Sequence, residues 1–379
     1  MANKAFRYRL YPSEEQIILF HKTFGCCRKI WNLILSDKIT SYQNTKHFGS
    51  QTPAQYKKDF PYLKEVDSLA LSNVQLHLQS ALKACFDSKR KRRNQFPKFK
   101  SKRRARKTYT TNNQNGTVSI IGNTIRLPKA GLVKAEIHRL PEKDYVLKSA
   151  TVSETADGIF YISILFEYEN KISPLPLSDD LNALGLDYAS DGLYVDDHGR
   201  KGTNHKYYLL SQKKLRTEQR RLSRRIGSKK NEVPSSNYKK QQAKLAKLHR
   251  HIANQRTDHL QKQSTEIANQ YDVICVEDLN MQAIANRKRH LGKHTYDNGY
   301  GMFLNMLSYK MADRGKYLVR VDKWFPSSQL CSCCGTKHPE MKDLKIRTMR
   351  CACGNQIDRD QNAAINIKKE GLRMLYKAV

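Results

Sequence analysis

The sequence predicts a multidomain chain of α/β and α+β class, with a small β-barrel and a helical insert followed by a mixed sheet flanked by helices. Residues 117–167 alternate apolar and polar side chains between turn residues, which is typical of antiparallel strands. Beyond residue 181, short apolar runs alternate with long helical stretches, which is typical of an α/β layer. The 379 residues are enough for two or three domains with their own cores.

A strand and two helices are predicted at the N-terminus. Residues Lys4–Tyr11 alternate apolar and basic side chains and stop at Pro12, as a strand does. Apolar residues at helical spacing then run from Ile17 to Leu33, and Ser13 suits the N-cap of that helix. A second helix is predicted over Ser68–Ser88, where apolar residues share one face.

The β-rich segment is predicted to hold strands at TVSII, TIRL, KSATVSETADG and FYISILFEY, with turns at Gly122 and Gly158. Together with the N-terminal strand, these strands would close a small barrel flanked by helices. Between this segment and the second helix lies a basic run, Lys89–Lys107. Its charge favours contact with a nucleic-acid backbone, and a solvated linker is the alternative.

Leu181 opens the α/β region. The stretch ALGLDYASDGLYVDDHG predicts two strands around a turn, and YDVICVEDL and YLVRVDKWF predict two further strands. Two long basic helices between Asn204 and Asn269, separated by the turn-rich GSKKNEVPSSN, are expected to pack as a hairpin. Strands separated by helices indicate a mixed sheet.

The charge of the chain predicts a polyanionic partner. Lys and Arg number 69 against 35 acidic residues, so the formal net charge is +34. A charge of this size disfavours compaction unless a polyanion neutralises it. The sequence has no apolar run long enough to span a membrane and no signal-peptide core at its start, so nucleic acid is the expected partner.

Three acidic residues stand where catalytic groups of α/β proteins gather. Asp187 and Glu277 each follow an apolar strand, and Asp360 heads a predicted helix. Each could instead be a structural residue, and Asp360 could be only a helix cap. Their rivals are Asp191, Asp278 and Asp358.

The combination of the three acids favours a metal-dependent site. Two divalent cations about 3.5–4 Å apart can activate water on one side of a phosphate and stabilise the leaving oxygen on the other. Such ions, Mg²⁺ above all, bind to carboxylate oxygens. The sequence therefore predicts a nuclease that hydrolyses phosphodiester bonds.

Five of the nine cysteines lie between residues 331 and 353, in two clusters that are each followed by glycine. Tetrahedral zinc takes four thiolates from two such hairpin tips, which predicts one structural zinc ion. The expected ligands are Cys331, Cys334, Cys351 and Cys353, with Cys333 as an extra thiol and His338 as a substitute candidate. The remaining cysteines fit core thiols, and the expected compartment is a reducing cytosol; they are Cys26, Cys27, Cys85 and Cys275.

Several motifs resemble one family. The stretch WFPSSQLCSCCG, the R-x-x-x-C-A-C-G tip that begins at Arg347 and the block DRDQNAAINI resemble the C-terminal signature of TnpB. TnpB proteins are transposon-encoded RNA-guided DNA endonucleases related to the CRISPR type V effectors. Upstream, YRLYPSEEQ, FPKFKSK, GLDYASDG and VICVEDLNM also resemble successive blocks of that family, so the resemblance runs from Lys4 to Ile367.

The resemblance implies an RNase H-like (RuvC) nuclease core with Asp187, Glu277 and Asp360 as catalytic acids and an inserted zinc ribbon. It also implies an oligonucleotide-binding β-barrel with a helical recognition insert. The implied partners are a guide RNA derived from the transposon end, the double-stranded DNA target and the guide–target heteroduplex, with a short motif read beside the target. No membrane and no obligate protein partner are expected.

The resemblance also divides the chain into domains. The expected boundaries are a β-barrel of residues 1–12 and 108–180, a recognition domain of 13–107, a nuclease core of 181–330, a ribbon of 331–354 and a final nuclease segment of 355–379. Two features depart from the family pattern. The second cysteine pair is C-x-C instead of C-x-x-C, and Gly299 is followed by Tyr300 where tryptophan is common.

Two other functions are compatible with these motifs. A nuclease-dead, guide-directed DNA-binding repressor would have lost at least one of the acids, whereas all three are retained. A guide-independent transposase or resolvase with the same core would bind transposon ends without an RNA.

Overall fold

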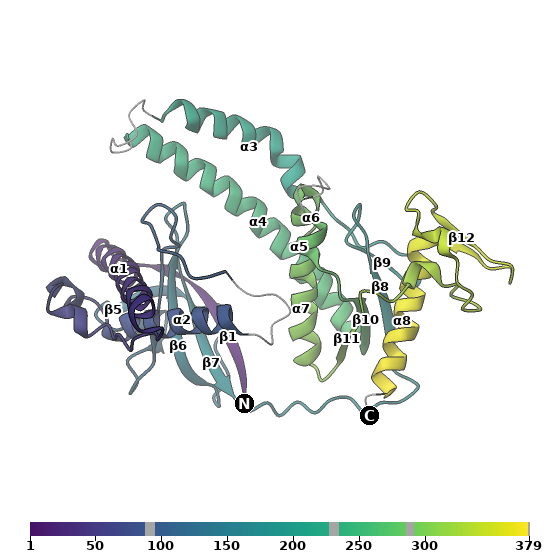
Figure 1. The fold of residues 1–379 in the computed structure, drawn as a ribbon, viewed down its shortest axis with the longest axis horizontal. Helices are drawn as coiled ribbons and strands as arrows, with labels where there is room; N and C mark the ends of the chain where they lie inside the picture. The colour runs from purple at the N-terminus through teal and green to yellow at the C-terminus, as the bar shows by residue number, and fades with distance from the viewer. Residues whose placement is uncertain (88–94, 227–234, 286–291, 378–379) are drawn as a thin grey trace. The chain divides into compact units, whose positions relative to one another are not determined.

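In the computed structural model, the described residues are 1–87, 95–226, 235–285 and 292–377. The chain divides into two compact units, residues 1–170 and 171–379 (Figure 1). The first unit contains a seven-stranded sheet, and the second contains a four-stranded sheet and a two-stranded one. The predicted mixture of α and β structure is confirmed, and the boundary between the units lies shortly before Leu181.

The seven-stranded sheet is antiparallel and has β1 (Ala2–Tyr11) at its centre, between β7 (Phe160–Tyr168) and β5 (Gly131–Glu136). The strand order is β2-β6-β7-β1-β5-β4-β3. The remaining strands are β2 (Thr108–Asn112), β3 (Ser119–Ile121), β4 (Thr124–Leu127) and β6 (Val146–Glu154).

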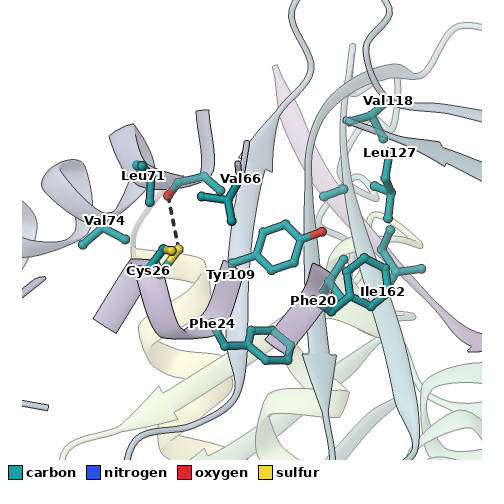
Figure 2. Packing of buried hydrophobic residues seen from close by; sticks show 14 of the residues in the cluster. Phe20, Phe24, Cys26, Val66, Leu71, Val74, Tyr109, Val118, Leu127 and Ile162 are labelled. Atoms are coloured by element: carbon teal, nitrogen blue, oxygen red, sulfur yellow. Dashed lines mark hydrogen bonds between the residues drawn. The ribbon is translucent and has the colours of Figure 1, made fainter. Parts of the chain in front are cut away.

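This sheet is open, whereas the sequence predicts a closed barrel. Its end strands, β2 and β3, do not pair with each other among the described residues. Helix α1 (Glu14–Thr45) covers the apolar face instead, and Figure 2 shows its aromatic side chains against the strands. The ring centroid of Phe20 lies 6.1 Å from that of Tyr109 in β2 and 5.7 Å from that of Phe160 in β7. Because the helix buries this face, closure of the sheet is not required.

The two predicted N-terminal helices are confirmed. The Ser13 hydroxyl accepts the Gln16 N–H at 3.3 Å and the Gln16 side chain accepts the Ser13 N–H at 3.0 Å, so a capping box starts α1. Asp67 caps α2 (Ser68–Phe86) by accepting the Leu69 N–H at 3.0 Å. Two short 3₁₀ helices, Gln55–Lys57 and Pro61–Lys64, lie between α1 and α2.

The four-stranded sheet of the second unit is mixed, as predicted, with the order β11-β10-β8-β9. Strands β8 (Ala183–Tyr188), β10 (Val273–Glu277) and β11 (Tyr317–Val321) are parallel, and β9 (Tyr194–Asp196) is antiparallel to β8. Helix α8 (Arg359–Lys377) covers one face, and α4 (Ser236–Gln270) and α7 (Tyr300–Ala312) cover the other (Figure 1). Alternate residues of each strand therefore face different helices.

The predicted helical hairpin consists of α3 (Tyr207–Arg224) and α4. Gln241 of α4 donates to the Glu218 carboxylate of α3 at 2.6 Å, and most of the predicted turn between the helices lies outside the described residues. The remaining elements are α5 (Met281–Ile284), α6 (Gly292–Asn298), the 3₁₀ helices Ser327–Gln329 and Pro339–Lys342, and the hairpin of β12 (Thr348–Arg350) and β13 (Gln356–Asp358). Within the described part of the chain, no helix is long and apolar enough to cross a membrane.

Gly371 allows helix α8 to approach strand β10 closely. A Cβ atom at this position would lie 2.7 Å from Cys275 Cβ and closer still to its Sγ, and Cys275 is fully buried. Gly301, on helix α7, has no such neighbour, since a Cβ there would lie 3.9 Å from Met281 Cγ.

We expect Gly371→Ala to lower the free energy of unfolding by about 1–3 kcal/mol, because the added methyl group overpacks the core. Gly301→Ala is the matched control, and it should raise that free energy by up to about 1 kcal/mol through its higher helix propensity. Urea denaturation of both variants measures the difference. Equal effects of the two substitutions would contradict the close approach of α8 and β10.

Candidate active site and cysteine centre

Two of the predicted acids lie beside each other at the carboxyl edge of the parallel strands. Asp187 is the penultimate residue of β8, and Glu277 is the last residue of β10. The parallel register pairs Leu186 with Val276, so the two acids follow at neighbouring positions of adjacent strands. The buried apolar runs before them carry both strands through the core and leave the carboxylates at its edge.

The third acid, Asp360, reaches the same edge from the first turn of helix α8. That helix packs directly on β8, because Gly185 has no side chain where the Ala364 carbonyl approaches. The negative charge of Asp360 contributes to a raised pKa of Asp187, so the two carboxylates lie within electrostatic reach. The structure thus places Asp187 within electrostatic reach of both other acids selected from the sequence.

Two carboxyl groups at this edge, those of Asp187 and Glu277, resist ionisation. Burial raises the pKa of Asp187 to about 8, and the charges of Glu277 and Asp360 act in the same direction. Burial also raises the pKa of Glu277 to about 7. Carboxylates that crowd together away from water are the hard, anionic oxygen donors that Mg²⁺ and similar cations bind. The chemistry of these donors suits a divalent cation, although among the described residues only the four cysteines lie close enough together to share one metal ion as they stand.

Arginines near these acids were not identified from the sequence. Nη2 of Arg347 donates to Oδ2 of Asp360 at 2.5 Å. Arg359 is buried, donates to the Asp343 carbonyl at 2.7 Å, and has a positive charge that acts to lower the pKa of Asp187. Arg347 is visible in the sequence as the first residue of the R-x-x-x-C-A-C-G stretch, but the sequence alone does not show that it lies beside Asp360.

The rival acids have other roles. Asp358 is the N-cap of α8, since its Oδ1 accepts the N–H of Asp360 at 2.9 Å and that of Gln361 at 3.2 Å. Asp278 is exposed and pairs with Arg320 at 3.5 Å, and Asp191 is exposed and pairs with Lys201 at 3.4 Å. Asp358 therefore supplies the cap that could have explained Asp360, and the Asp360 carboxylate pairs with Arg347 instead.

The four cysteines selected from the sequence lie together, with their Sγ atoms all within 4.8 Å of one another. Cys331 and Cys353 are 3.7 Å apart, and Cys334 and Cys351 are 3.5 Å apart. A tetrahedron with zinc–sulfur bonds of about 2.3 Å has edges of about 3.8 Å, so the group fits a zinc ion. Cys333 lies outside the group.

Local hydrogen bonds favour the thiolate form of Cys331. Burial opposes its ionisation, yet donors that include the Cys334 backbone and the Asn355 amide lower its pKa to about 6. The Asn355 Nδ2 atom lies 3.3 Å from Cys331 Sγ. His338, the substitute candidate, bonds Glu340 at 2.9 Å and does not join the cysteine group.

Helix α8 connects the cysteine centre to the acids. Fully buried Asn362 accepts the Ser332 N–H at 2.9 Å and donates to the Leu330 carbonyl at 2.7 Å. One turn later, Asn366 donates to the same carbonyl at 2.7 Å and to the Ser327 carbonyl at 2.8 Å. The first cysteine tip is thereby attached to the helix that presents Asp360.

The basic run of the first unit is attached to helix α1. Residues 89–94 of this run lie outside the described residues, and residues 95–107 form no helix or strand. Nε1 of Trp31 donates to the Lys98 carbonyl at 3.0 Å, and Asn32 bonds the Lys100 carbonyl and N–H at 2.9 Å and 2.8 Å. The Lys100 ammonium lies 3.5 Å from the Trp31 ring centroid. This cationic segment is therefore held in place beside the helix.

Three family models match the chain. A "Helix-turn-helix domain" matches residues 1–47, a "Probable transposase" family matches residues 163–288, and a "Cas12f1-like, TNB domain" matches residues 300–367. Among solved structures, a chain of a Cas12f1–sgRNA–target DNA complex is similar, with a TM-score of 0.58 and 14% identity over 97% of this chain and 98% of that one. At this identity the likeness concerns the fold.

Two curated relatives cover nearly the whole chain. A Streptomyces pristinaespiralis protein named "Putative RNA-guided DNA endonuclease" is 31% identical over 97% of this chain and 89% of its own length. A protein of Escherichia coli K12 named "Putative RNA-guided DNA endonuclease InsQ" is 28% identical over 98% of this chain and 93% of its own. "TnpB-like protein L79" of Acanthamoeba polyphaga mimivirus is 33% identical over 38% of this chain and 28% of its own. The similarity along the full chain, with the matching family models, shows that this chain belongs to the TnpB family.

Proposed function

We propose that this chain is a transposon-encoded endonuclease that cuts DNA at sites selected by a guide RNA. The observation that supports this best is the convergence of Asp187, Glu277 and Asp360 at one sheet edge, where burial and mutual repulsion raise the pKa of Asp187. The names of the full-length relatives describe the same activity.

Asp187, Glu277 and Asp360 would hold Mg²⁺, with two ions as the expected number. Bound divalent cations supply an activated water and stabilise the leaving oxygen of the phosphodiester. The protein contributes the orientation of its carboxylates, which is fixed by two parallel strands and the start of α8. Arg347, which lies on Asp360, contributes a guanidinium that can form two parallel hydrogen bonds to a phosphate.

The cysteine centre would hold one structural zinc ion. All four donors are sulfur atoms, which leaves no position for a reactive water. Its function would be to fold the ribbon, whose tip is attached to α8 by Asn362 and Asn366.

The domain assignments extend this proposal. Residues 181–330 and 355–379 would form an RNase H-like (RuvC) core with the ribbon of 331–354 inserted, and residues 13–107 would form a recognition domain. Residues 1–12 and 108–180 would form an oligonucleotide-binding domain related to a barrel, although its sheet is open.

The proposed partners are a guide RNA from the transposon end, the double-stranded DNA target and the heteroduplex that they form. The net charge of +34 and the cationic segment attached to α1 complement these polyanions. Base pairing would select the target, while the protein would read a short adjacent motif.

A nuclease-dead repressor is less favoured, because all three acids are present and converge at one sheet edge. A guide-independent transposase or resolvase would bind transposon ends without a defined RNA. The sequence of any RNA that purifies with the chain separates this function from the proposed one.

We expect Asp187→Ala to lower the rate of plasmid cleavage in the presence of guide RNA and Mg²⁺ by about a thousandfold, since a ligand of the reaction centre is lost. Binding of RNA and DNA should persist in a gel-shift assay. Asp191→Ala, which removes an exposed acid, should cut at nearly the unmodified rate. Undiminished cutting by the Asp187 variant would refute the site assignment.

Stabilisation by Mg²⁺ should increase with pH. The folded-state pKa values of Asp187 and Glu277, about 8 and about 7, exceed the ordinary values, so these carboxyls favour the fold most at low pH. That contribution is lost as pH rises through 7–8, where the ionised groups repel each other and bind a cation best. Mg²⁺ should therefore raise Tm by roughly 2–4 °C more at about pH 8.5 than at about pH 6.

Thermal unfolding with and without Mg²⁺ measures this difference. The control variant Asp187→Asn should show a smaller change in its Mg²⁺-induced Tm shift over the same range, because only Glu277 still titrates there. An equal Mg²⁺-induced Tm shift at both pH values in the unmodified chain would contradict this prediction.

Elemental analysis should find one zinc ion per chain. Cys331→Ser should lose that zinc and lower the Tm of the second unit, because ribbon folding depends on the metal. Cys333→Ser is the matched control and should retain zinc, since its thiol lies outside the group. Loss of zinc from both variants, or from neither, would show that the ligand set is different.

A further inference from the structure

Trp324 is a large aromatic side chain that the fold leaves almost entirely exposed. It is 80% exposed, whereas the only other tryptophan of the chain, Trp31, is 8% exposed. Tryptophan is usually well buried, because its ring removes a large apolar area from water. The exposed ring of Trp324 is therefore available to contact a ligand.

The segment that presents this ring is ordered by hydrogen bonds. The backbone N–H of Trp324 donates to Oδ1 of Asp322 at 2.8 Å, and the backbone N–H of Phe325 donates to the Asp322 carbonyl at 3.0 Å. Exposure of the ring is thus a property of a defined turn after β11, which holds the ring outside the core.

Trp324 lies at the sheet edge that bears the carboxylates. Val321, the last residue of β11, pairs with Glu277 in the parallel register and accepts the Asp278 N–H at 2.9 Å. Trp324 follows three residues later, and an extended chain spans at most about 3.6 Å per residue. Its Cα atom therefore lies within about 11 Å of Val321, the strand partner of a catalytic acid.

The surroundings of the ring are charged. The Lys323 ammonium lies 4.9 Å from the ring centroid. Arg320, on β11, has its guanidinium 3.5 Å from the carboxylate of Asp278, the residue that follows β10. Aromatic rings beside cations bind single-stranded nucleic acid, where the bases stack and the phosphates meet positive charge. An apolar groove in a protein partner would match the ring but not these cations.

We propose that Trp324 stacks on an unpaired base of the strand that enters the carboxylate site. This inference rests on the proposed function and extends it to a single-stranded substrate. A base inside a duplex has both faces covered by its neighbours, so stacking on the indole requires a strand that is separated from its complement. Every base has a π-face, so this contact holds the strand without selecting its sequence.

Because the chain has only two tryptophans, fluorescence tests the contact directly. The full-length chain with Asp187→Ala, purified with its RNA, binds DNA without cutting it. A short single-stranded oligodeoxynucleotide unrelated to the guide should quench the fluorescence, and the same sequence as a closed duplex should not. In the Trp324→Phe form of this variant only Trp31 remains, and the quenching should disappear. Quenching that persists in that form, or that the duplex produces equally, would overturn the inference.

Single-turnover cleavage by the guide-loaded chain provides the functional readout. Loss of one stacked base in Trp324→Ala should slow cleavage about tenfold, whereas Trp324→Phe retains a ring and should cut at nearly the unmodified rate. Leu210→Ala, which removes a side chain that is 78% exposed on α3, is the control and should have no effect. Unchanged cleavage by Trp324→Ala would refute the role.

The two assays fail independently. If the unmodified complex does not cut, the proposed function is wrong, while the quenching experiment still decides whether Trp324 binds a base.

Discussion

The close contact between strand β8 and helix α8 determines the geometry of the candidate site. Gly185 permits it, because a Cβ atom there would lie 2.8 Å from Lys368 Cβ. Asp197 reinforces the contact, since its carboxylate accepts the Gly185 N–H at 3.2 Å and the Lys368 ammonium at 2.8 Å. Asp187 extends from the strand and Asp360 from the helix. The separation of these two acids is therefore set by how closely their backbones pack.

The site gathers carboxyl groups in a chain whose net charge is +34. Near the acids, Arg347 bonds Asp360, and buried Arg359 lowers the pKa of Asp187 against the effect of burial. The remaining repulsion gives the group its fit to divalent cations, and the basic surface elsewhere attracts phosphate. The cysteine ribbon participates in this arrangement, because Asn362 attaches it to the helix that presents Asp360.

Periodicity predicted much of the fold, and its failures have a physical cause. The parallel strands and the helical hairpin of the second unit show clear apolar patterns, so the sequence identified them. Strands β2 and β5 were not predicted. β2 is TYTTN, whose buried positions are Tyr109 and Thr111, and β5 begins at Gly131, so neither has an apolar run. The closed barrel was predicted wrongly, because only packing shows that α1 covers the sheet that closure would otherwise bury.

By itself, the sequence determined the residue types and the spacing that chemistry requires: three acids beside apolar runs, two cysteine tips and a large excess of cations. Only the tertiary structure decided which of these side chains lie close to one another. It made Asp358 the helix cap and placed Asp360 within electrostatic reach of Asp187. It also placed Arg347 on Asp360 and Trp324 outside the core. These outcomes depend on how a strand, a helix and a ribbon pack against one another, and local sequence contains no measure of distances between segments far apart in the chain.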